Sequence, residues 1–470
     1  MIGAAINVIP FMIQKNIPGI GPWVLPAYVC AAIPAVLAAL AYAILASAMP
    51  RAGGSYVYAS RALNPYLGFV ASFSQWFGLS TAIGVVSYVL VAFLRDIAIP
   101  LGYTGLAHAM ETGLTRPAIA LAFLWFFVAV NLRGLKSYEL TLIPLMVLMF
   151  AAGFIVIGAG FWFNQEDFAA ALLARESKAL PPSPPVPFDF SKFLAAASIL
   201  FSSFIGFDSI AQAGGEAKNP GRNLPLAIGI SMVSVGAYYM AFTAAVYHAV
   251  PWAYVAQEAM TRDVTAPGLL GMLLSPGWTV AIVAGAAVAL TNDLPAMLLA
   301  VSRLMFAWAE DGIFPKAVAR IHPRWGTPHV ALVLSGVMAS ISILGSHLAS
   351  DFFLGVDILV TSMLVNFLLM CASVLALKKT NPELARKITV LPSRWFQIPL
   401  SALGLFALGG FLAVHISKDL SAPVTHWALR STVVWLAVMA VSSLIYFVQV
   451  AKLRRTGIDL KAHFAALPLE

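Results

Sequence analysis

The chain has 470 residues, of which 60% are hydrophobic and only 10% are charged, and its formal net charge is +8. Ordinary soluble domains carry about 25% charged residues, so this composition excludes a soluble protein. Many stretches without charge are long enough to cross a bilayer, which takes about 20 apolar residues. The sequence therefore predicts an all-α polytopic membrane protein.

The predicted elements follow from these stretches in chain order. After an apolar first segment, eleven complete spans are expected, at residues 21–49, 65–99, 117–131, 140–163, 193–213, 224–250, 277–309, 329–345, 352–377, 396–416 and 432–450. The loop at 164–189 contains the run PPSPPVP, which predicts an extended structure because proline breaks helices. Residues 310–328 predict a short amphipathic helix along the membrane surface.

The basic residues indicate how the chain crosses the membrane. When the spans alternate in direction, about two thirds of the 28 Lys and Arg residues fall on one side. The excess of Lys and Arg marks the cytoplasmic side, so the C-terminus is expected to be cytoplasmic. The positive charge therefore indicates topology in a plasma (inner) membrane. The lipid bilayer is an expected partner, and nucleic acid is not.

The span at 193–213 is interrupted near its middle by the string FIGFDS. A carboxylate such as Asp208 costs at least about 2.5–3.5 kcal/mol in the hydrocarbon, and Gly206 costs about 1 kcal/mol relative to alanine in a helix. Together they predict a helix that unwinds and offers backbone groups to a small substrate, as in secondary transporters. A kinked helix in which Asp208 caps the second half is a compatible alternative.

The chain also begins with a Gly/Pro-interrupted apolar segment, GAAINVIPFM. Two interrupted spans at corresponding places in the two halves of a chain are the best sequence indication of a transporter site. A zwitterion suits such a site, since a helix N-terminus attracts a carboxylate and freed carbonyls accept from an ammonium group.

Four strings resemble the amino acid–polyamine–organocation (APC) superfamily of permeases. They are IGAAINVIP at 2–10, ILASAMPRAGGSYVYASRALNPYLGF at 44–69, FDSIAQAGGEAKNPGRNLP at 207–225, and VSRLMFAWAEDGIFPKAVARIHPRWGTPHVAL at 301–332. Their order and spacing match the superfamily over nearly the whole chain. The resemblance implies a twelve-helix fold of the leucine-transporter type, built on a 5+5 inverted repeat.

The resemblance divides the chain into helices 1–5 at 1–165, a Pro-rich extracellular loop at 166–189, helices 6–10 at 190–378, helices 11 and 12 at 394–451, and a cytoplasmic tail at 452–470. Members of the superfamily carry about half a helix of apolar sequence before the first motif. Helix 1 is therefore expected to be truncated in its N-terminal half, through a start site assigned too late or through a real loss. We expect the open reading frame to continue upstream.

The resemblance also implies which residues form the site. The substrate is expected to bind between the interruptions in helices 1 and 6, at Gly3, Ala4, Ala5, Ile6, Asn7, Ser203, Ile205, Gly206, Phe207 and Asp208. Phe207 is expected to cover the substrate. Ala5 and Asn7 depart from the usual glycine and phenylalanine, so the identity of the substrate stays open.

Two further sets of residues are candidates for the transport cycle. Asp293, with Thr291 and Asn292 beside it, is a candidate coupling group, or alternatively a silent hydrogen-bonded acid in helix 8. The resemblance also suggests an inner gate, for which a plain turn is the alternative. Its candidate members are Gly53, Gly54, Tyr56, Glu216 and Arg222.

These observations predict a secondary active transporter of an amino acid, working by alternating access through proton-coupled symport or exchange. The alternatives are a polyamine or cationic amino-acid antiporter, and a membrane sensor that binds an amino acid without transporting it. The sequence contains neither a metal-binding motif nor a GxxxxGK[ST] nucleotide loop. We therefore expect no enzymatic activity and no cofactor.

Overall fold

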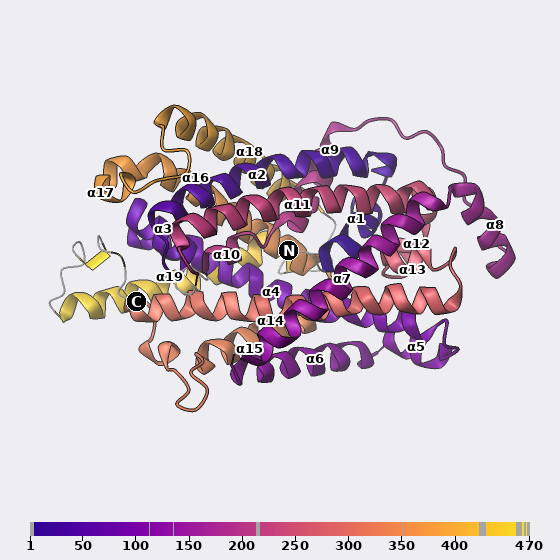
Figure 1. Cartoon of the computed structure of the whole chain (residues 1–470), viewed down its shortest axis with the longest axis horizontal. Coiled ribbons are helices and arrows are strands. Elements are labelled where there is room, and N and C mark those ends of the chain that lie inside the picture. The colour runs from indigo at the N-terminus through magenta and orange to yellow at the C-terminus, as the bar shows by residue number, and fades with distance from the viewer. Residues whose placement is uncertain are drawn as a thin grey trace.

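A computed structural model describes residues 4–111, 113–134, 136–212, 217–349, 351–422, 429–456, 463–464 and 467. Within these ranges the protein is all-helical (Figure 1). Eleven helical segments are long and apolar enough to cross a membrane, as the sequence predicted. They end within a few residues of the expected boundaries.

The helices that form the bundle are α1 (Ala4–Asn16), α2 (Val24–Ala48), α4 (Pro65–Ala98), α6 (Thr115–Leu132), α7 (Lys136–Trp162), α9 (Phe190–Leu200), α11 (Pro220–Ala249), α14 (Pro276–Glu310), α15 (His329–Leu348), α16 (Phe353–Thr380), α18 (Arg394–Ser421) and α19 (Ser431–Arg455). Shorter helices connect them: α3 (Gly54–Ala62), α5 (Thr104–Glu111), α8 (Gln165–Glu176), α10 (Asp208–Gln212), α12 (Trp252–Thr261), α13 (Ala266–Leu270) and α17 (Pro382–Ala385).

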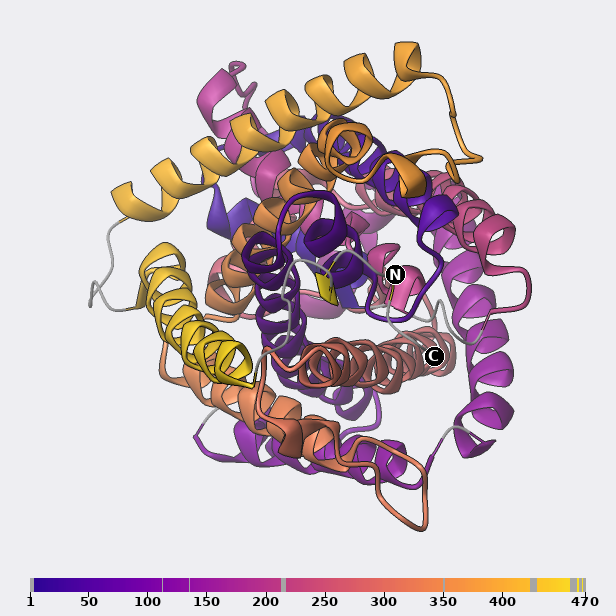
Figure 2. The same ribbon diagram turned by 90° about the vertical axis from the view of Figure 1, so that its left-hand side faces the viewer.

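The helix α4 lies at the centre of the bundle and is almost wholly buried. Asn64 caps its first turn by accepting a hydrogen bond from Leu67 N (2.9 Å), and Pro65 occupies the first helical position, where proline is tolerated. The helix packs against α14, α15 and α16. Figure 2 shows α18 and α19 at the periphery, and less than a third of the most apolar stretch of each is buried in the protein. Such exposed apolar faces are suited to contact with lipid.

Two predictions about the loops need correction. The loop at 164–189 is extended only in its second half, because α8 occupies the first. There, Asn164 accepts from Glu166 N and Asp167 N, while the Asp167 carboxylate accepts from Asn164 N. This capping box starts a helix before the prolines begin. The loop at 310–328 contains only the short 3₁₀ helix η4 (Lys316–Ala319) in place of the expected amphipathic helix.

The two ends of the bundle differ in charge. One end holds the start of α4 and the last turns of α14, α16 and α19, and we call it the basic end because of its Lys and Arg residues. It lies to the left in Figure 1. The other end, which holds α5, α8, α12 and α13, is called the opposite end.

Candidate functional site

The interrupted helix lies at the middle of the bundle. After α9, one turn of 3₁₀ helix (η2, Phe201–Phe204) leads to Ile205, whose backbone is extended (φ −72°, ψ 143°). Gly206 follows with φ +126°, a conformation that residues with a side chain rarely adopt, and α10 then begins. The predicted interruption at 205–207 is therefore present. The first helix, α1, lies against η2 and α9. It is continuous from Ala4 to Asn16 with Pro10 inside it, so the second interruption expected in this segment is absent from its described residues.

Asp208 is fully buried at the start of α10. Its Oδ1 accepts a hydrogen bond from Gly206 N (2.9 Å), and its Oδ2 accepts from Gln75 Nε2 of α4. The alternative interpretation of Asp208 was a cap on the second half of the helix. Its carboxylate instead accepts from Gly206 N, two residues earlier, and from Gln75, and so holds the turn at Gly206 against α4.

Gln75 belongs to a chain of buried hydrogen bonds that the sequence analysis did not predict. Ser55 donates its single hydroxyl hydrogen to Gln75 Oε1 (2.5 Å). The hydroxyl of Tyr42 is therefore the donor in its bond with Ser55 Oγ (2.6 Å). Asn366 Nδ2 in turn donates to Tyr42 Oη (2.7 Å). Gln212 Nε2 also donates to Gln75 Oε1 (3.1 Å). These donors and acceptors lie on α2, α3, α4, α10 and α16, and the chain runs in one direction toward the carboxylate of Asp208.

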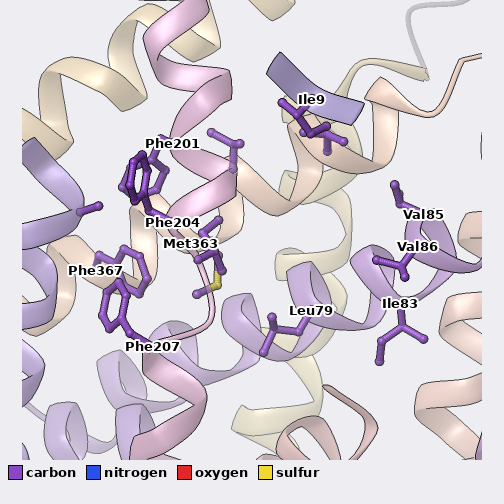
Figure 3. Packing of buried hydrophobic residues seen from close by; sticks show 14 of the residues in the cluster. Ile9, Leu79, Ile83, Val85, Val86, Phe201, Phe204, Phe207, Met363 and Phe367 are labelled. Atoms are coloured by element: carbon purple, nitrogen blue, oxygen red, sulfur yellow. The ribbon is translucent and has the colours of Figure 1, made fainter. Parts of the chain in front are cut away.

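A small cavity of about 60 Å³ lies beside the interruption. Apart from Ser202, its lining is apolar and comes from α1, α4, η2 and the start of α16: Ala5, Val8, Ile9, Ala82, Val85, Val86, Val89, Ser202, Phe352, Gly355, Val356 and Leu359. Figure 3 shows Ile9, Val85 and Val86 on these neighbouring elements.

Ser202 is the polar side chain of this lining. Its Oγ is buried and has no hydrogen-bond partner among the described residues. A buried hydroxyl without a hydrogen-bond partner destabilises the protein by about 1–3 kcal/mol. The Ser202 hydroxyl is therefore suited to binding a polar group of a ligand. Ser203 was predicted as a site residue and Ser202 was not, although the two adjacent serines in an apolar span were a visible signal.

The predicted site residues differ in their burial and in whether they line the cavity. Ala5 lines the cavity, whereas Ile6 and Asn7 are buried. Ala4 is the first residue of α1, and Gly3 lies outside the described residues. Ser203 and Ile205 are buried at the interruption.

Phe207 was expected to cover the substrate. It is fully buried and stacks on Phe367 (ring centroids 5.1 Å apart), with its edge against Tyr42 (5.6 Å). Figure 3 shows Phe207 beside Phe367, away from Ile9 and Val85. In this conformation, Phe207 packs within the aromatic core.

The candidate gate residues near α3 meet the end of α14. Tyr56 Oη donates to Asp311 Oδ2 (2.7 Å), and Arg61 forms a buried ion pair with the same oxygen (2.8 Å). A β-carbon at Gly54 would lie 2.7 Å from Gln212 Nε2, so the start of α3 approaches α10 closely only because residue 54 is a glycine. Gly53 makes the turn before α3, with φ +92°.

The remaining predicted residues lie elsewhere. Arg222 is exposed in a groove between α2 and α11, and Glu216 is outside the described residues. Asp293 is half-buried in the middle of α14, as are its neighbours Thr291 and Asn292. Thr291 donates to Val288 O of its own helix (2.7 Å).

At the opposite end, hydrogen bonds from an ion-paired Arg95 and Asp96 join α4 to the segment between α12 and α13. Arg95 pairs with Asp96 (2.7 Å) and donates to Asp263 O (2.8 Å), and Thr265 donates to Asp96 Oδ2 (2.6 Å). Burial raises the pKa of Asp351, whose carboxylate accepts from Phe353 N (2.9 Å) at the start of α16. Buried charged side chains therefore link separate segments at both ends of the bundle, through an ion pair at the basic end and through hydrogen bonds at the opposite end.

These features define a multi-pass membrane protein with a buried cavity beside an interrupted helix. The chain belongs to the amino acid permease family, whose model matches residues 1–450. It is therefore a transmembrane permease of the APC superfamily and not an enzyme, as the sequence predicted.

The chain is similar to several characterised transporters. It is 28% identical to a branched-chain amino acid permease of Bacillus subtilis (strain 168) over 382 residues, which cover 78% of this chain and 76% of the relative. It is 25% identical over 470 residues to a methylthioribose transporter of the same organism, with 95% and 89% covered. A low-affinity putrescine importer of Escherichia coli (strain K12) is 25% identical over 352 residues, with 73% and 69% covered.

Proposed function

We propose that this permease is a secondary active transporter that carries an amino acid with an aliphatic side chain across the plasma membrane by alternating access. The observation that supports this most is the interruption at 205–207 beside an apolar cavity that contains the unpartnered Ser202 hydroxyl. In this proposal, residues 1–165 and 190–378 form the two inverted repeats.

The backbone at the start of α1 and at the interruption after η2 is proposed to bind the charged groups of the substrate. The N-terminal end of α1, at Ala4 to Asn7, would donate N–H groups to the carboxylate, and the positive end of the helix dipole would attract it. Carbonyls freed at the end of η2 would accept from the ammonium group. Ser202 and Ser203 supply hydroxyls next to them.

The cavity favours an aliphatic side chain over a cationic one. Its walls are valine, isoleucine, leucine, phenylalanine and alanine. The nearby carboxylate of Asp208 already accepts from Gly206 N and Gln75 Nε2, and a cation would have to displace one of them. Ligand pockets are commonly about 300–1,000 Å³, so this cavity of about 60 Å³ has to widen before substrate enters. Polyamine or cationic amino-acid exchange and amino-acid sensing without transport remain the alternatives.

Counterflow in proteoliposomes tests the proposal. Vesicles loaded with unlabelled leucine should accumulate labelled leucine, isoleucine or valine, and putrescine or arginine should compete weakly. Uptake with and without a pH gradient, compared between the wild type and Asp293→Asn, tests the proposed coupling role of Asp293. Ligand-dependent thermal stabilisation without counterflow would indicate a sensor, and preferred counterflow of putrescine or arginine would contradict the aliphatic class.

We further propose that Gly53, Gly54 and Tyr56 form an inner gate together with Arg61 and Asp311. Breaking a buried ion pair by removing one partner costs about 3–5 kcal/mol. Asp311→Asn should therefore lower the melting temperature and speed amide hydrogen exchange in α3.

The double variant Arg61→Met/Asp311→Asn removes both charges and should recover part of that stability. Asp357→Asn is a suitable control, because its pair with Lys418 at the opposite end is longer (3.7 Å) and more exposed. Unchanged exchange in α3 of the Asp311→Asn protein would rule out a gate held by this pair.

A further inference from the structure

A long groove on the outer surface of the bundle lies between α2 and α11. Its volume is about 840 Å³. The lining residues are Val36, Ala39, Leu40, Ala43, Ser47, Gly221, Arg222, Pro225, Leu226, Ile228, Gly229, Met232, Val233, Thr389 and Val390. Most of them are apolar, and Val36, Leu226 and Val233 are 42%, 54% and 74% exposed.

The dimensions of the groove match one leaflet of a bilayer. Along α2 it runs from Val36 to Ser47, which is about 17 Å at about 1.5 Å per residue. Half of a hydrocarbon core that is about 30 Å thick is about 15 Å. Val36 and Val233 lie near the middles of their helices, and Ser47 and Gly221 lie near the basic end. The groove therefore extends from the mid-plane of the membrane to one interface.

Positive charge gathers where the groove reaches this interface. Arg222 lines the groove and is exposed, and Lys218 lies exposed just before the start of α11. Arg386 and Lys387 are exposed in the loop whose next residues, Thr389 and Val390, complete the lining. Basic residues near a membrane surface attract anionic lipid by about 1 kcal/mol each.

We propose that this groove binds one anionic phospholipid. An acyl chain lies between α2 and α11, and the phosphate group pairs with Arg222 at the basic end. Gly229 makes room for the chain, because a β-carbon at this position would meet no atom within 4 Å. The apolar length of the groove, its volume and the positive charge at one end together fit a lipid better than a soluble metabolite. The proposal is independent of which substrate is transported.

Native mass spectrometry of the purified protein tests this proposal with phosphatidylglycerol and phosphatidylcholine that carry the same acyl chains. The wild type should retain one phosphatidylglycerol at activation energies that remove phosphatidylcholine. Arg222→Gln should weaken phosphatidylglycerol binding roughly five- to tenfold. Phosphatidylcholine binding should fall less, because the choline cation offsets the charge of its phosphate. Gly229→Phe fills the groove and should weaken the binding of both lipids.

Two matched variants control for charge and bulk elsewhere on the surface. Arg133→Gln removes an exposed arginine at the basic end, and Gly410→Phe adds a ring on the exposed face of α18, where there is equal space. Neither should change lipid retention, and melting temperatures will show that all four variants fold. Equal retention of the two lipids by the wild type, or unchanged retention by Arg222→Gln, would overturn the proposal in favour of non-selective annular lipid. A dimer that excludes lipid from the groove would overturn it in favour of a second copy of the chain.

Discussion

Asp208→Asn is expected to reduce the initial rate of substrate uptake at least tenfold. Both carboxylate oxygens of Asp208 accept hydrogen bonds, from Gly206 N and from Gln75 Nε2. An asparagine has one oxygen, so its amide group would face one of these donors. A buried donor without a partner costs about 1–3 kcal/mol, which corresponds to roughly 5–150-fold in an equilibrium. The measurement is uptake into proteoliposomes, normalised to the amount of folded protein.

A second substitution distinguishes hydrogen bonding from charge. In Gln75→Glu/Asp208→Asn, the new carboxylate at 75 can accept from the asparagine and still accept from Ser55 and Gln212. Part of the uptake should therefore return. If both variants fold and the double variant stays inactive, the hydrogen-bond interpretation fails.

Asp419→Asn provides the matched control for a buried carboxylate. Asp419 is also buried and accepts from two backbone donors, Ser431 N (3.1 Å) and Thr432 N (2.9 Å), at the start of α19. Its substitution should lower stability by a similar amount. Because α18 and α19 lie at the periphery, uptake per folded molecule should stay near that of the wild type (Figure 2).

Gly206→Ala is the second substitution with a large expected effect. The φ of +126° is accessible to glycine and strained for alanine, at a cost of about 1–3 kcal/mol. The chain can relieve this strain only by changing the turn between η2 and α10. We therefore expect uptake to fall at least tenfold, with a modest loss of thermal stability.

Gly158→Ala is the control for this prediction. Gly158 lies in α7 with open space around it, so alanine should fit and favour the helix by up to about 1 kcal/mol. Uptake by this variant should be unchanged. Wild-type uptake by Gly206→Ala would mean that the strained turn is not needed for transport.

Some parts of the fold were readable from the residues alone. The spans follow from charge-free stretches, because an unpaired charge is costly in hydrocarbon and a helix satisfies its own backbone hydrogen bonds. The interruption at Gly206 and Asp208 was visible for the same reason, since neither residue suits a helix that only crosses the membrane. The residues of the capping box at Asn164 were also present in the sequence, but the prolines that follow them led to the prediction of an extended loop.

The partners of the buried polar groups could not be predicted in this way. Gln75 and Asp208 are 133 residues apart, and Arg61 and Asp311 are 250 apart. Apolar periodicity is weak in helices that are hydrophobic on every side, so it does not indicate how each helix is rotated.

The sequence by itself determined the membrane class, the number of complete spans and the place where one of them breaks, because these depend on local composition and backbone chemistry. Only the tertiary structure decided that Phe207 turns into the aromatic core, that Ser202 faces a cavity and that Arg222 lies at an exposed groove between α2 and α11. These outcomes depend on helix rotation and on the packing of side chains from distant segments, and a single sequence carries little information about either.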